Sequence, residues 1–131
     1  MSNLRLINET EITSSVSSVN VTDVFSADFD IYKIVTNGFE DTTNTPNLMI
    51  RFINSSGSVI SASNYDYAYL NMRADASFPE NRATSQTYIR GFFGFSDPTY
   101  SQGDVSYIFN PYSYSSSTFA LSHFSSLQTA T

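Results

Sequence analysis

Apolar and polar residues alternate in short stretches along this chain, and clusters of Asn, Ser, Asp and Gly separate the stretches. Residues 48–53 (LMIRFI) are the clearest example, because every second residue from Leu48 to Phe52 is apolar. A period of two residues is that of a half-buried β-strand. The same reasoning predicts strands over residues 4–7, 19–25, 29–35, 59–61, 65–72, 88–95, 105–109 and 119–124. The pattern therefore predicts one all-β domain over residues 1–131, an antiparallel, jelly-roll-like β-sandwich.

Turn residues delimit these stretches. Residues 54–57 (NSSG) have the chemistry of a tight turn, and Asn110-Pro111 ends the strand before it. Residues 38–47, 74–85 and 97–103 are expected to be loops. Gly91 and Gly94 lie inside a predicted strand, where glycine indicates a bulge or a close backbone approach. Residues 29–35 (FDIYKIV) carry apolar groups on both sides, which predicts a strand buried on both faces.

Composition supports the β class and restricts the partners. Nine Tyr and eleven Phe residues are present, with no Trp and no Cys. Aromatic residues favour strands, and the lack of cysteine excludes disulfides and thiolate chemistry. The net charge of -6 disfavours binding to nucleic acid or to anionic lipid, so neither is an expected partner. No secretion signal and no membrane-spanning run is visible, and we expect a soluble protein.

Residues able to carry out catalysis are sparse. His123 is the only histidine, and it shares a strand face with apolar residues, which favours a hydrogen-bonded structural role. No serine lies in a Gly-x-Ser-x-Gly motif, and Gly91–Gly94 lacks the spacing of a phosphate loop. Asp28 and Asp30 are expected to share a strand face, but nothing local distinguishes them from solvated charges. We expect no enzyme activity, no cofactor and no metal, although a calcium ion bound by residues 97–104 stays open.

Arginine and tyrosine supply the candidate interface residues, which are Arg51, Arg73, Arg90, Tyr65, Tyr67 and Tyr69. Arginine suits planar pairing with carboxylates across a subunit contact. The three tyrosines fall on one strand face, and tyrosine is enriched at interfaces because one end is apolar and the other is polar. Surface ion pairs and a cross-strand aromatic ladder are the alternatives. A sugar-stacking face is a further possibility for the tyrosines.

Several segments carry a resemblance to a known group of proteins. They are Val24-Phe25 with residues 29–34 (FDIYKI), and residues 48–52 (LMIRF), 56–58 (SGS), 64–68 (NYDYA) and 107–111 (YIFNP). Together, over residues 23–124, they resemble a pattern in small structural proteins of tailed bacteriophages, especially marine ones. These segments are strand cores and turns, and no set of functional residues comes with the resemblance.

The resemblance implies a virion protein made in the cytoplasm of a bacterial host. We expect a capsid decoration or cement subunit that binds other virion proteins, chiefly the major capsid protein. It is expected to form a homo-oligomer, and similar proteins suggest a trimer. The alternative is a tail-fibre or baseplate-associated module that recognises host surface glycans, and a small hydrolase is a third class.

Overall fold

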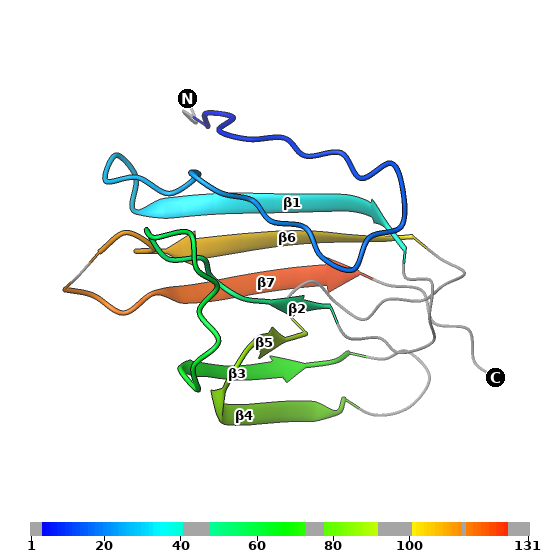
Figure 1. Cartoon of the computed structure of the whole chain (residues 1–131). Helices are drawn as coiled ribbons and strands as arrows, with labels where there is room; N and C mark the ends of the chain where they lie inside the picture. The colour runs from blue at the N-terminus through cyan, green and yellow to red at the C-terminus, as the bar shows by residue number, and fades with distance from the viewer. Residues whose placement is uncertain (1–3, 41–47, 73–77, 92–100, 114, 126–131) are drawn as a thin grey trace.

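The computed structural model describes residues 4–40, 48–72, 78–91, 101–113 and 115–125. Every regular element in these ranges is a β-strand (Figure 1). The strands are β1 (Ile31–Phe39), β2 (Met49–Ile50), β3 (Tyr65–Leu70), β4 (Glu80–Gln86), β5 (Ile89–Arg90), β6 (Gln102–Phe109) and β7 (Phe119–Ser125). All pairings between them are antiparallel. The prediction of an all-β, antiparallel protein is therefore confirmed.

The largest sheet has three strands in the order β1-β6-β7. β6 lies in the centre, with Ile108 opposite Tyr32 on β1 and opposite Ala120 on β7. A bulge interrupts the β1-β6 register between Thr36 and Phe39, where Gly38 has a φ of 68°. At the other end of β6, Asn110 takes a φ of 53°, so the strand stops at the Asn-Pro pair as predicted.

Two smaller sheets accompany the large one. β2 pairs with β5 through Met49↔Arg90 and Ile50↔Ile89, and β3 pairs with β4 over most of its length. A bulge in the β3-β4 pair falls near Ser85, which has a φ of 54°. The backbone N–H of Ser85 donates to Asp66 Oδ1 at 2.8 Å. This side-chain acceptor stabilises the irregular backbone of β4.

The buried core is small and built on tyrosine. Among the described residues, the buried hydrophobic side chains are Tyr32, Tyr65 and Ile108. Partly buried side chains pack against the Tyr32–Ile108 pair: Phe25, Phe29, Ile34, Ile50, Phe52, Ile89 and Ala120. Since Ile50 and Ile89 belong to the β2-β5 pair, that pair contacts one side of the large sheet. We call this side the inner face.

A chain of aromatic rings connects the large sheet to β3. Phe25 packs edge-on against Tyr32, with ring centroids 4.9 Å apart, and lies 6.3 Å from Phe52. Phe52 in turn stacks on Tyr65 at 6.3 Å, and Phe29 packs against the other side of Tyr32 at 6.0 Å. We call these five residues the aromatic chain.

Each buried tyrosine also holds a loop through its hydroxyl group. The Tyr32 hydroxyl accepts from Ser26 N at 2.8 Å and donates to Ser26 O at 3.0 Å. The Tyr65 hydroxyl accepts from Phe52 N at 3.0 Å and donates to Ile60 O at 2.9 Å. Tyrosine serves better than phenylalanine here because a buried backbone group needs a hydrogen-bond partner.

Several predicted strands and loops are corrected by the structure. Residues 4–7 and 19–25 contain no strand, although they alternate. Residues 48–53 form only the short β2, and residues 59–61 contribute a single bridge, Ile53↔Val59. Alternation in these segments is not matched by a backbone partner, and a strand exists only where its hydrogen bonds are paired.

The opposite error occurs at β4, which lies in the predicted loop of residues 74–85. Its sequence, ENRATSQ, has no apolar alternation, and its pairing with β3 makes it a strand. β1 also extends to Phe39, into the predicted loop of residues 38–47, and β6 begins at Gln102, inside the predicted loop of residues 97–103. Residues 41–47, 73–77 and 92–100 lie outside the described residues, so most of the remaining loop predictions and Gly94 are not described.

Several large hydrophobic side chains of the described strands remain exposed to solvent. On the large sheet they are Ile31, Val35, Phe119 and Leu121, which are 55% to 61% exposed. A single copy of the chain therefore leaves apolar strand surface uncovered.

Candidate functional site

Exposed apolar side chains gather on the side of the β1-β6-β7 sheet that faces away from the core. We call it the outer face. It consists of three rows of paired residues: Ile31, Phe109 and Phe119; Lys33, Tyr107 and Leu121; Val35, Val105 and His123. The β1 and β7 residues of all three rows are exposed, and the β6 residues are half-buried. Phe109 and Phe119 stack with ring centroids 4.5 Å apart and an interplanar angle of 5°.

This arrangement differs from the sequence-based expectation for two strands. The predicted burial of residues 29–35 on both faces is wrong for the outer side, where Ile31 and Val35 are exposed. The apolar side of residues 105–109 likewise faces away from the core. Because Ile108 is the residue that packs against Tyr32, every second residue of β6 counted from Ile108 must point inward.

The inner face of β6 is consequently polar along most of its length. Gln102, Asp104 and Ser106 are all buried. Asp104 Oδ2 accepts a short hydrogen bond from Ser106 Oγ, and Asp104 Oδ1 accepts one from Ser122 Oγ on β7 at 2.5 Å. The Gln102 Oε1 and Nε2 atoms are buried without a hydrogen-bond partner. The sequence-based search missed this cluster, and the alternation of polar residues 102, 104 and 106 was the only signal of it.

The buried carboxylate does not form a catalytic triad with the single histidine. Ser122 and Asp104 are hydrogen-bonded, but His123 projects from the outer face, on the other side of the sheet. His123 is exposed, and among the described residues its ring has no hydrogen bond. The prediction of a hydrogen-bonded structural histidine is therefore wrong. The Asp104 cluster is best explained as a satisfied buried acid.

The three candidate tyrosines differ in what they contact. Tyr65 is 7% exposed, and both hydrogen bonds of its hydroxyl are intramolecular. Tyr67 and Tyr69 are half-buried and stack at 6.3 Å with an interplanar angle of 14°. The Tyr69 ring covers Gly91, where a Cβ atom would lie 2.9 Å from the ring. Gly91 lies just after β5 rather than inside a strand, and what approaches it closely is a side-chain ring, not another backbone. Tyr65 belongs to the core of this chain.

The candidate arginines are also engaged by their own chain. Arg51 Nε donates to Thr87 O at 2.8 Å, and its guanidinium lies 5.8 Å from the centre of the Tyr88 ring. Arg90 is half-buried in β5, and its Nε is buried without a hydrogen-bond partner. Arg73 lies outside the described residues.

The carboxylates considered for catalysis or metal binding do not form a site. Asp28 lies in a turn before β1, where it accepts from Ser26 Oγ at 3.3 Å, so it shares no strand face with Asp30. Among the described residues, no three acidic or histidine side chains are placed to hold a metal ion. Residues 97–100, half of the range considered for calcium (97–104), fall outside the described part. No helix in the described ranges has the length and apolarity that crossing a bilayer requires.

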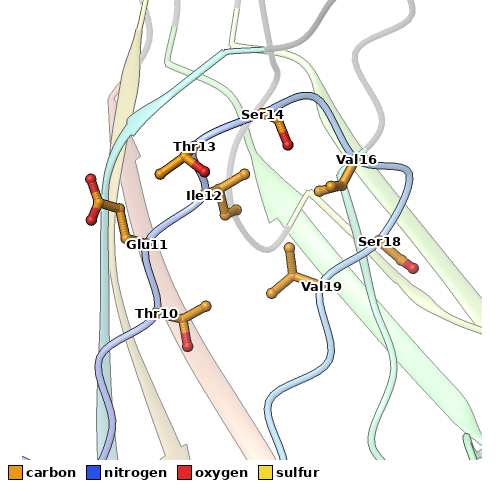
Figure 2. A pocket seen from close by; sticks show the side chains of 8 residues that line it. All are labelled: Thr10, Glu11, Ile12, Thr13, Ser14, Val16, Ser18 and Val19. Carbon is orange, nitrogen blue, oxygen red and sulfur yellow. The ribbon is translucent and has the colours of Figure 1, made fainter.

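The N-terminal segment forms the other unusual feature. Residues 10–19 enclose a hollow of about 220 Å³, in which Ile12, Val16 and Val19 point toward one another (Figure 2). The hollow is the inside of a single loop, and threonine and serine hydroxyls make up most of its polar lining. Such a lining provides no paired acid and base for catalysis.

In comparisons with known proteins, no family model, no curated protein and no solved structure matches the chain.

Proposed function

We propose that this protein is a structural subunit of a tailed-bacteriophage virion, used as a capsid decoration or cement protein. One observation carries the proposal. A single copy has a small core and leaves the apolar residues Ile31, Val35, Phe119 and Leu121 of the outer face exposed. A subunit that becomes part of an assembly buries such surface against its neighbours.

Other features agree with an assembly role. Among the described residues, the one buried acid is hydrogen-bonded to serines, and the single histidine stands apart from it. The sequence resemblance to small phage structural proteins supplies the kind of assembly. The proposal includes a jelly-roll-like sandwich in which the β2-β5 pair and its neighbours form a layer over the inner face of the large sheet. It also includes self-association, with a trimer as the expected state.

The copy number of the chain in purified virions tests the proposal. A decoration protein is present in scores to hundreds of copies, whereas a receptor-binding module at the tail is present in a few. Quantitative mass spectrometry of virions, with the major capsid protein as internal reference, should give a high ratio. A few copies per particle would favour the tail-associated alternative, and absence from the particle would refute both.

A further inference from the structure

The outer face and the N-terminus of the chain are complementary to each other. We propose that the N-terminal arm, defined as residues 4–11 (LRLINETE), docks on the outer face of a second copy of this chain. The inference rests on the proposed function, since it specifies how identical subunits of that assembly hold one another. It assigns roles to two features that the fold of a single copy does not use.

The arm makes few contacts with its own chain. Leu4 and Leu6 are 74% and 77% exposed, and every residue of the arm is exposed. Its one hydrogen bond among the described residues joins Thr10 Oγ1 to Asn8 Oδ1, inside the arm itself. The arm has no strand partner, although its residues alternate. An extended, apolar, unpaired segment is the kind of element that adds to a neighbouring subunit.

The outer face offers apolar surface of the same kind. Phe119 and Leu121 on β7 are exposed to 56% and 57%, and Ile31 and Val35 on β1 are similarly exposed. Neither the arm nor any other described segment covers them. Soluble monomers rarely leave a contiguous apolar patch of this extent open to water, and such patches mark protein contacts.

The charges of the arm and of the outer face are complementary. Residues 4–7 of the arm are apolar except for Arg5, and Glu9 and Glu11 follow them. The outer face is also divided, because its first row is wholly apolar and its other two rows contain Lys33 and His123. No acidic residue occurs in the three rows. An occupant with an apolar half and an acidic half therefore fits better than a second outer face, which would bring basic residues together.

The arm is long enough to cover the outer face of a second copy. Eight extended residues span at most about 27 Å, and the seven residues of β7 span about 23 Å, so the arm can cover the length of the face. The segment between the arm and β1 can act as the connection between subunits. An arm that binds the next subunit forms a heterologous contact, which closes as a ring when the rotation allows it. Such a contact accommodates the trimer expected from the sequence.

Three leucine-to-glutamate substitutions in the full chain test this inference by analytical ultracentrifugation. Leu121→Glu alters the outer face, Leu6→Glu alters the arm, and Leu70→Glu is the matched control. Leu70 is also a strand residue and is 55% exposed, but it lies on β3. We expect the unaltered chain and Leu70→Glu to associate equally. Leu121→Glu and Leu6→Glu should each raise the dissociation constant at least about 30-fold.

Mixing the two defective variants gives the most specific result. A Leu6→Glu subunit keeps an intact outer face, and a Leu121→Glu subunit keeps an intact arm. An equimolar mixture should therefore form heterodimers, joined by one arm contact, that neither variant forms alone. Circular dichroism checks that each variant is folded, and Val35→Glu, on β1 of the same face, replaces Leu121→Glu if that variant is not.

Several results would overturn the inference. A monomeric unaltered chain would do so, as would normal association of Leu6→Glu or a mixture that stays monomeric. A monomer that is nonetheless abundant in virions would mean that another virion protein covers the outer face, and the virion role would stand without its self-association. Arm-dependent oligomers of a chain that is absent from virions would refute the proposed function and leave the arm contact intact.

Discussion

The sequence and the structure assign different roles to Tyr65. Removing its hydroxyl oxygen distinguishes the two roles. The sequence places Tyr65 among candidate interface residues, whereas the structure buries its ring and gives its hydroxyl two backbone partners, Phe52 N and Ile60 O. Tyr65→Phe keeps the ring and its stacking on Phe52. It removes both hydrogen bonds, each with a net contribution of about 1 kcal/mol. We expect the free energy of unfolding to fall by about 2 kcal/mol.

Urea denaturation at a fixed protein concentration measures this change. With a slope of about 2 kcal/mol per M, the midpoint should fall by about 1 M. Tyr67→Phe is the control, because the Tyr67 hydroxyl has no hydrogen bond among the described residues, and its midpoint should change by less than about 0.25 M. Equal midpoints for the two variants would refute the loop-holding role of Tyr65. Weaker subunit association at unchanged stability would instead support the interface role.

Two further substitutions test the buried acid and the close glycine contact. Asp104→Ala removes the carboxylate that accepts hydrogen bonds from the Ser106 and Ser122 hydroxyls, and should lower the free energy of unfolding by about 2 kcal/mol in urea denaturation. Asp66 is exposed and accepts from Ser85 N, so Asp66→Ala should lower it by less than about 1 kcal/mol. A variant as stable as the unaltered protein would show that the serines find other acceptors. Gly91→Ala places a Cβ atom 2.9 Å from the Tyr69 ring, on a left-handed backbone with φ +70°. Gly57→Ala is the control, because Gly57 has φ +80° but open space around it. Gly91→Ala should lower the melting temperature clearly more than Gly57→Ala. Equal losses would mean that Tyr69 moves aside freely.

The β class and the main strands could be predicted because they depend on local patterns. The predicted strands 65–72, 105–109 and 119–124 correspond to β3, β6 and β7. The predicted turn at residues 54–57 is confirmed, with Gly57 N donating to Asn54 O at 2.9 Å and a positive φ at Gly57. Each of these features is encoded within a few neighbouring residues, so no knowledge of distant partners was needed.

The missed features depend on contacts between distant segments. β4 has no apolar alternation of its own and is a strand because β3 lies beside it. Alternation also cannot tell which side of a strand faces the core, because both sides of β6 have the same period. The choice is made by Ile108 and Tyr32 in the core, and it turns Asp104 inward and Tyr107 outward. The candidate site, which was drawn from arginines and from the tyrosines of residues 65–69, therefore overlooked the buried acid.

The aromatic chain makes distant parts of this protein thermodynamically dependent on one another. A two-stranded ribbon such as β3-β4 is marginal in water by itself, so its persistence depends on the neighbours that its aromatic side chains contact. Phe25, which belongs to no strand, is therefore coupled to β3 through Phe52 and Tyr65. Amide protons of the large sheet and of β3 should become open to exchange together, as one cooperative unit, and small ribbons can thereby share the durability of the whole domain.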